Sequence, residues 1–206
     1  MILYDYFRSS AAYRVRIALN FKNVDYQRFS VNLLEGEQHS EDYRKLNPQR
    51  LVPLLETSSG RLTQSLAIIE YINETYPDPP LLSDDPWTRA KQRSMAHVIA
   101  CDVHPLQNSR VLKYLRKKDQ SEPAIKRWIA NWMRAGFESL EKQAPTTPYL
   151  GGDTPKLPDI LLVPQIYNAG RFEVPLDNFP KLCAIAERCK TLQPFLEASP
   201  DYPQGG

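Results

Sequence analysis

The chain has 206 residues, of which 42% are hydrophobic, so it can form one large domain or two small ones. Its 26 Lys and Arg nearly balance its 24 Asp and Glu, and the net charge of +2 argues against a protein that wraps nucleic acid. No apolar run approaches the roughly 20 residues of a transmembrane helix, and no signal peptide is recognisable, so we expect a cytoplasmic protein without a membrane span.

Several common kinds of site are not expected from this sequence. The three cysteines, Cys101, Cys183 and Cys189, form no CxxC pair, and the three histidines are scattered. Neither a disulfide framework nor a metal site is therefore expected. The chain also has no glycine-rich phosphate loop of the GxGxxG or GxxxxGKS type, which argues against a dinucleotide or nucleoside triphosphate cofactor.

The first 80 residues mix strand and helix patterns. Ile2–Phe7 is a short β-rich run, and the helical stretch Ala11–Phe21 follows it after two serines that can cap a helix. The later elements that we expect are strands at Tyr26–Leu33, Val52–Glu56 and Arg61–Thr63, and a helix that begins at Gln64-Ser65 and extends to Tyr76. The order βαβ and then ββα predicts an α/β domain, a single sheet with helices packed on it.

Residues 77–86 contain four prolines, which sustain neither a helix nor a central strand. We therefore expect a linker there, between a domain of residues 1–80 and a second domain of residues 87–206. The patterns beyond the linker are helical. We expect a long helix at Trp87–Arg116 with a kink at Pro105, and a second helix whose apolar stripe runs from Ile125 to Leu140 and includes Trp128 and Trp132. Two more helices are expected at Ile160–Ala169 and Leu182–Leu192. The second domain is expected to be all-helical, with a loose tail at Ser199–Gly206.

The first candidate site lies where the first strand runs into the first helix. Arg8, Ser9 and Ser10 stand there, beside the unpaired N–H groups and the positive dipole end of the helix, which together can hold an anion or a thiolate. The alternative is that a serine only caps the helix. These residues alone leave both interpretations open.

Two further segments of the same domain could bind a peptide or a carboxylate. Val52-Pro53 precedes a strand, and a cis proline there would leave the backbone of Val52 free to pair with a peptide-like ligand, whereas a trans proline would only begin an edge strand. Gln64 and Ser65 begin a helix, where a carboxylate could meet backbone N–H groups, a hydroxyl and an amide, although a plain helix cap needs no ligand.

Together these segments resemble the zeta class of glutathione transferases. The matching segments are Tyr6–Leu19, Leu46–Pro53, Gln64–Tyr71, His104–Asn108 and Leu162–Gln165, so the resemblance covers nearly the whole chain. It implies a thioredoxin-like α/β N-terminal domain that binds glutathione, an all-α C-terminal domain that lines the pocket of an acidic substrate, and a homodimer. It also implies glutathione-dependent cis–trans isomerisation of maleylacetoacetate to fumarylacetoacetate.

The resemblance assigns roles to single residues. By it, Ser9 and Ser10 lie at the glutathione sulfur, Val52 and Pro53 at the cysteinyl backbone, and Gln64 and Ser65 at the γ-glutamyl end, with Gln38 and Gln107 as outer contacts.

Cationic side chains are required as well, because the expected substrate carries two carboxylates. The candidates are Arg8, Arg110 and Arg171, since a guanidinium pairs with a carboxylate through two hydrogen bonds. Each of these arginines could instead be exposed or form an ordinary salt bridge. Arg14 and Arg16 face opposite directions on a helix, and Arg14 is the one that we expect to approach the site as a catalytic residue.

The expected chemistry depends on an ionised thiol. A free thiol has a pKa near 8.5, and a hydroxyl donor at a helix N-terminus could lower that pKa by roughly two units, which is about 2.7 kcal/mol of thiolate stabilisation. The thiolate would add to the cis double bond, the resulting single bond would rotate, and elimination would return the trans isomer and free glutathione.

Other functions stay open at this point. The nearest is the same chemistry on maleylpyruvate, whose compact and highly charged structure Arg110 would suit. A transferase acting on α-halo acids is another. Outside the enzymes, the chain could be a non-catalytic glutathione-transferase-like scaffold, but such proteins often lose the thiol-activating residues, and Arg8, Ser9 and Ser10 are all present here.

Two positions depart from the family pattern. Ala11 stands where many zeta enzymes carry a cysteine after the two serines, and this difference could alter the substrate range. Lys156 stands where the pattern places Thr or Ser three residues before Asp159, so half of a helix capping box is missing. We therefore expect the substitution Lys156→Thr to raise thermal stability.

Overall fold

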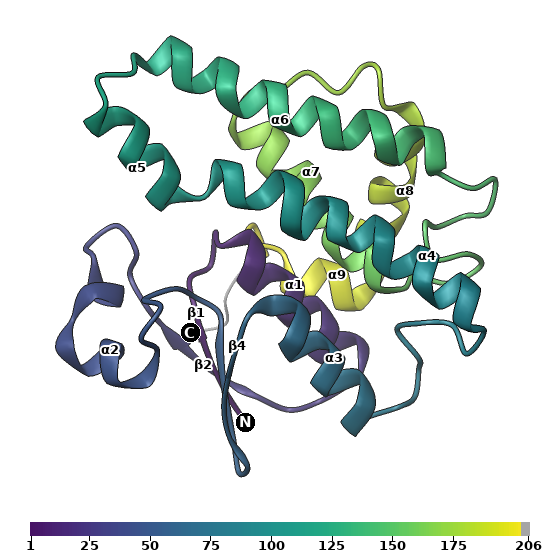
Figure 1. The fold of residues 1–206 in the computed structure, drawn as a ribbon. Helices are drawn as coiled ribbons and strands as arrows, with labels where there is room; N and C mark the ends of the chain where they lie inside the picture. The colour runs from purple at the N-terminus through teal and green to yellow at the C-terminus, as the bar shows by residue number, and fades with distance from the viewer. Residues whose placement is uncertain (203–206) are drawn as a thin grey trace. The chain divides into compact units, whose positions relative to one another are not determined.

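The structure is a computed structural model that describes residues 1–202, so the end of the tail expected at Ser199–Gly206 lies outside the described residues. The chain forms two compact units (Figure 1). Unit 1 contains Met1–Pro80 and the segment that begins at Leu192, and unit 2 contains Leu81–Thr191. None of the helices within residues 1–202 is both long enough and apolar enough to span a bilayer.

Unit 1 is built on a four-stranded sheet, and the four predicted strands are all present. They are β1 (Ile2–Asp5), β2 (Gln27–Ser30), β3 (Leu54–Thr57) and β4 (Gly60–Thr63), in the spatial order β2-β1-β3-β4. β1 pairs in parallel with β2 and antiparallel with β3, and β3 and β4 form an antiparallel hairpin. Helices α1 (Ser10–Phe21) and α3 (Ser65–Thr75) follow β1 and β4 in the chain and contact each other, which completes a thioredoxin-like fold.

Between β2 and β3 lie two short elements that the sequence pattern does not predict. These are a 3₁₀ turn at Glu37–His39 and helix α2 (Glu41–Leu46), which Ser40 caps by accepting a hydrogen bond from the N–H of Tyr43 (3.2 Å). An element of three to six residues is too short to show the periodic apolar pattern on which such predictions rest.

The C-terminal helix α9 (Gln193–Ala198) belongs to unit 1, whereas we expected residues 87–206 to form one helical domain. It packs on α1, where Phe195 is fully buried with its ring centroid 6.4 Å from that of Phe21. A helix of six residues must pack on another element, but its sequence does not show which domain supplies that element. The C-terminal boundary of the helical domain could therefore not be placed from the sequence.

Unit 2 is helical, as predicted, but its first long helix is interrupted. The helices are α4 (Pro86–His97), α5 (Ser109–Lys117), α6 (Glu122–Gln143), α7 (Leu157–Arg171) and α8 (Pro180–Lys190). Instead of one kinked helix over residues 87–116, α4 passes into a π-helical turn (Val98–Val103) and a 3₁₀ turn (His104–Gln107). Pro105 has no N–H to continue an α-helix, and Asn108 starts α5 anew by accepting a hydrogen bond from the N–H of Arg110 (3.1 Å).

The stripe on α6 packs into the core of unit 2, except for its two tryptophans, of which Trp128 is half-buried. Ile125, Ile129, Met133, Phe137 and Leu140 are buried, but Trp132 is 37% exposed. Its ring lies 5.8 Å from the ring of Trp128, which is anchored by a hydrogen bond from its Nε1 to the carbonyl of Leu106 (2.7 Å). Trp132 thus lies at the margin of the stripe, where an indole covers its neighbour and remains partly in water.

Helix α7 is buried along most of its length and begins at the incomplete capping box. The Asp159 carboxylate accepts hydrogen bonds from the N–H groups of Leu150 (2.7 Å), Gly151 (2.9 Å) and Lys156 (2.9 Å). The Lys156 side chain has no acceptor atom, and the N–H of Asp159 bonds to the backbone carbonyl of Lys156 instead (3.0 Å). The side-chain half of the box is therefore absent.

Candidate active site

The two serines of the first candidate site lie at the N-terminus of α1. Ser9 is the N-cap, and its Oγ accepts a hydrogen bond from the N–H of Ala12 (3.3 Å), so Ser9 does cap the helix. Ser10 is the first helical residue and is buried. No acidic side chain occupies the first turn, so nothing there competes with a bound anion for the positive end of the helix dipole.

Arg8 lies in the same loop, against two aromatic rings. Its guanidinium carbon is 5.0 Å from the ring centroid of Phe7 and 6.0 Å from that of Tyr6, and it donates a hydrogen bond to the Tyr6 hydroxyl (3.2 Å). Cation–π contacts hold the charge in place without neutralising it. A positive charge therefore stays next to the serines.

The loop before β3 holds the second of the predicted ligand-binding segments. The Val52–Pro53 bond is cis, which was one of the two alternatives at this position. The loop is braced by Asn47, whose Nδ2 donates to the carbonyl of Leu51 (2.8 Å), and by Tyr43, whose hydroxyl donates to the same carbonyl (2.7 Å). Within residues 1–202, neither backbone group of Val52 takes part in a backbone hydrogen bond. Both groups are thus available to pair with a ligand.

The other predicted anion site lies at the N-terminus of α3. Gln64 has φ +71°, which is unusual for a residue other than glycine and is frequent at functional positions. Its amide donates to the Oε1 of Gln49 (2.9 Å). Ser65 is buried, and its Oγ accepts a hydrogen bond from the guanidinium of Arg14 (3.3 Å), which is itself buried. Arg14 thus lies at the α3 site, with Ser65, and joins α1 to α3.

Two of the expected outer contacts are buried glutamines with amide atoms that have no partner among residues 1–202. Within the described residues, Oε1 of Gln38 and both amide atoms of Gln107 make no hydrogen bond. An unpaired buried polar group costs about 1–3 kcal/mol, so a polar ligand that pairs with these atoms is favoured. Gln38 belongs to unit 1 and Gln107 to unit 2.

The other two candidate arginines lie on helices of unit 2. Arg110 is exposed in the first turn of α5. Arg171 is exposed at the end of α7, where it donates to the Oδ1 of Asn168 (3.2 Å) and its guanidinium carbon is 5.7 Å from the Phe172 ring centroid.

Sequence reasoning missed two residues with features of functional groups. Gln49 contacts Gln64 from the loop before β3, and its place among the segments of the resemblance was the available signal. Gln165, in α7, is fully buried with both amide atoms unpaired among the described residues, and it follows Pro164 in another of those segments.

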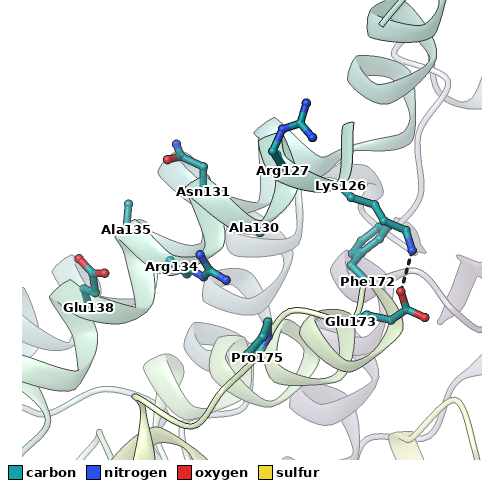
Figure 2. Close-up of a pocket in the computed structure, with 10 residues that line it drawn as sticks. All are labelled: Lys126, Arg127, Ala130, Asn131, Arg134, Ala135, Glu138, Phe172, Glu173 and Pro175. Carbon is teal, nitrogen blue, oxygen red and sulfur yellow. Dashed lines mark hydrogen bonds and ion pairs between the residues drawn. The ribbon is translucent and has the colours of Figure 1, made fainter. Parts of the chain in front are cut away.

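Unit 2 contains a groove that none of these residues lines. It encloses about 580 Å³ between α6 and the segment that follows α7 (Figure 2). Arg134 extends toward Pro175 within it, and Lys126 pairs with Glu173 (2.7 Å), so part of its charge is internally neutralised. None of the residues predicted for the site lines this groove.

Within residues 1–202, no group of three or more His, Cys, Asp or Glu could hold a metal ion.

Comparison with known proteins shows which family combines these features. Residues 1–74 match the family described as glutathione S-transferase, N-terminal domain. The maleylacetoacetate isomerase of Pseudomonas aeruginosa is 44% identical over 203 residues, 97% of this chain and 96% of that protein. A holo structure of a maleylpyruvate isomerase, described as a bacterial glutathione S-transferase of the zeta class, has a TM-score of 0.97 and 41% identity, and covers 100% of both chains. The chain is a zeta-class glutathione transferase.

The zeta-class relatives also include a structure with a ligand of informative chemistry. A maleylacetoacetate isomerase from Anaeromyxobacter dehalogenans, with a TM-score of 0.87 and 37% identity over 98% of this chain and 97% of that one, carries dicarboxyethyl glutathione and citrate in its active site. In the zeta-class transferase described here, the serines, the Val52 loop and the α3 site all lie within the 74 residues that match the family's N-terminal domain.

Proposed function

We propose that this zeta-class transferase is a glutathione-dependent cis–trans isomerase that converts maleylacetoacetate to fumarylacetoacetate. The observation that carries the proposal is the N-terminus of α1, where Ser9 and Ser10 meet a helix end without acidic side chains, next to the charge of Arg8. Hydroxyl donors, a dipole and a cation all favour a thiolate over a thiol.

The rest of unit 1 supports the binding of glutathione in an extended form. The free backbone groups of Val52 suit the cysteinyl peptide group, and the α3 N-terminus with Ser65 and Arg14 suits the γ-glutamyl carboxylate. The unpaired Oε1 of Gln38 accepts a further N–H. The cysteinyl peptide group and the γ-glutamyl carboxylate of the tripeptide thus each have a partner of matching chemistry in unit 1.

The reaction uses glutathione as a catalyst that emerges unchanged. The thiolate forms a carbon–sulfur bond to one carbon of the cis double bond, and the displaced electron pair moves onto the conjugated carbonyl as an enolate. The former double bond is now single and rotates. The enolate then collapses, the carbon–sulfur bond breaks, and the trans diacid and the thiolate are released. The bound dicarboxyethyl glutathione of the relative is glutathione that carries a two-carboxylate group, as this scheme requires.

The two carboxylates of the substrate need cationic partners. We assign this role to Arg8, Arg110 and Arg171, because guanidinium groups bind carboxylates through paired hydrogen bonds. Arg110 and Arg171 are both exposed residues near the ends of helices, which supports this assignment.

Maleylpyruvate is the second candidate substrate. The reason is the likeness to the maleylpyruvate isomerase structure, together with Arg110, which suits a compact diacid. Both substrates require the same chemistry, so the choice between them rests on specificity.

We further propose that the protein is a cytoplasmic homodimer, in keeping with its family. Sedimentation at micromolar concentration tests the dimer, and a monomer would contradict this part of the proposal.

The decisive assay compares both diacids with and without glutathione. We expect isomerisation to depend on glutathione, glutathione not to be consumed, and kcat/KM to be higher for maleylacetoacetate. The variants Ser9→Ala and Ser10→Ala test the two serines. The variant that lacks the serine at the sulfur should have a kcat about a hundredfold lower than the wild type, and the kcat of the other variant should fall much less. Isomerisation that proceeds equally without glutathione, or two variants with wild-type rates, would contradict the proposal.

A further inference from the structure

Arg16 is a charged side chain in the interior of unit 1, and the proposed function gives it no role. It lies on α1 and is only 1% exposed. Its NH1 donates to both carboxylate oxygens of Asp5 (2.8 and 2.9 Å). Its NH2 donates to the carbonyl of Phe7 (2.9 Å), and its Nε donates to the carbonyl of Ala198 (2.9 Å). A charge buried to this degree is retained only where its partners are in place, so this guanidinium ties three separate segments together.

Two of those segments form the approach to the serines. β1 ends at Asp5 and α1 begins at Ser10, so residues 6–9 are the whole connection. Within it, the N–H of Ser9 donates to the carbonyl of Tyr6 (2.8 Å), which forms a tight turn. Phe7 lies inside this turn, and its carbonyl is held by Arg16. One side chain therefore fixes the end of β1 and the turn that delivers Ser9.

The third segment is the C-terminal helix. The last carbonyls of a helix have no partner within the helix, and a cation near that end is favoured by the helix dipole. In α9, the Ala198 carbonyl accepts from Arg16, the Phe195 carbonyl accepts from the Tyr13 hydroxyl (3.4 Å), and the Pro194 carbonyl accepts from the Asn20 amide (3.3 Å). A helix of six residues is not stable alone, so these contacts from α1 hold it.

We propose that Arg16 is a positioning residue for the sulfur-binding serines and that α9 completes its set of partners, so the C-terminal segment supports the N-terminal site. The inference rests on the proposed function, in which those serines hold the glutathione sulfur. Donors that stabilise an anion must be held within about 0.5 Å of the productive geometry, and a misplacement of about 1 Å can cost a hundredfold in rate. Arg16 acts through the backbone of residues 6–9 and does not touch the sulfur itself.

The test compares Arg16→Lys and Arg16→Met with the control Arg28→Met. Arg28 binds the same Asp5 carboxylate (2.7 Å), but from the exposed edge strand β2. We expect both Arg16 variants to raise the pKa of the bound glutathione thiol by about one unit and to lower kcat about tenfold, with little change in KM for the diacid. Arg28→Met should change neither the thiol pKa nor kcat.

A second measurement uses the protein without glutathione. In the Arg16 variants, hydrogen exchange should become faster together at the amides of residues 7–10 and of α9, and it should stay at the wild-type rate in Arg28→Met. If Arg16→Met does not fold, Arg16→Lys decides, because an ammonium keeps the charge beside Asp5 but lacks the planar fork that reaches all three acceptors.

The proposal is overturned by folded Arg16 variants that keep the wild-type thiol pKa and exchange rates, or by Arg28→Met causing changes of the same size. A wild-type protein that does not ionise the thiol would instead contradict the proposed function. In that case the exchange rates still decide whether Arg16 and α9 order the turn.

Discussion

At the scale of single residues, the proposed chemistry depends on the few side chains at the start of α1. Ser9 already uses its Oγ as a helix cap, and Ser10 is buried beside it. A capping role and a ligand-binding role are compatible, because a hydroxyl can accept one hydrogen bond and donate another. The capping observed for Ser9 therefore leaves its proton available for a thiolate.

Asp159 is the residue whose titration should affect stability most visibly. Burial raises the pKa of this carboxyl from 3.8 to about 6, although three backbone N–H groups partly oppose the shift. Because the folded-state pKa lies above the unfolded value, the contribution of Asp159 to the free energy of unfolding is complete below pH 3.8 and is lost as the pH rises through about 6.

This dependence predicts the behaviour of Asp159→Asn. The free energy of unfolding of the wild type, minus that of the variant, should fall by an amount on the order of 2 kcal/mol between pH 4 and pH 7. Denaturant titrations of both proteins across this range measure the difference and cancel the other titrating groups. A difference that is constant or that increases with pH would contradict the raised pKa.

At the scale of elements, the N-terminus of α7 carries a prediction that follows from the incomplete capping box. Lys156→Thr supplies a side-chain acceptor at the N-cap and should stabilise the protein by about 1 kcal/mol, which is a few degrees in melting temperature. Lys156→Ala is the matched control, since it removes the ammonium without adding an acceptor. An unchanged or lower melting temperature for Lys156→Thr would count against the capping argument.

The contact between α6 and the π-helical turn depends on a glycine. A Cβ atom at Gly136 would lie 2.2 Å from Cγ2 of Val103, which is buried and β-branched, so neither side can easily move. We predict that Gly136→Ala destabilises the protein by about 1–3 kcal/mol, despite the better helix propensity of alanine. The control is Gly170→Ala in α7, where a Cβ would meet no atom within 4 Å and stability should be kept. Equal melting temperatures for the two variants would contradict this account.

At the scale of the whole molecule, the sequence predicts those parts that depend on local patterns. The strands, α1, α3, the stripe on α6 and the three binding segments all have a period, a cap or a turn that is visible in the chain. The break between α4 and α5 is harder to place, because Pro105 predicts an irregularity but not a new N-cap at Asn108. The position of α9 depends on side chains of α1 that donate hydrogen bonds to its carbonyls, and local patterns do not show these contacts. The same holds for the pairing of Gln64 with Gln49, which joins residues 15 apart in the chain.

The same limit explains why the role of Arg16 is visible only in three dimensions. The sequence shows that Arg14 and Arg16 point to opposite sides of α1, and both turn out to be buried in polar contacts. Arg14 pairs with Ser65 and Arg16 with Ala198, and both partners are far away in the chain, so the sequence does not show which arginine lies at the start of α3 and which braces the backbone.

The central claim, that the start of α1 keeps the glutathione sulfur ionised, is tested most directly by titrating the thiol of bound glutathione through its thiolate absorbance. The pKa of the thiol should be roughly two units lower when bound than when free, and this lowering should be lost in one of the two serine variants. A bound thiol that titrates at the same pH as free glutathione in the wild-type protein would contradict the account.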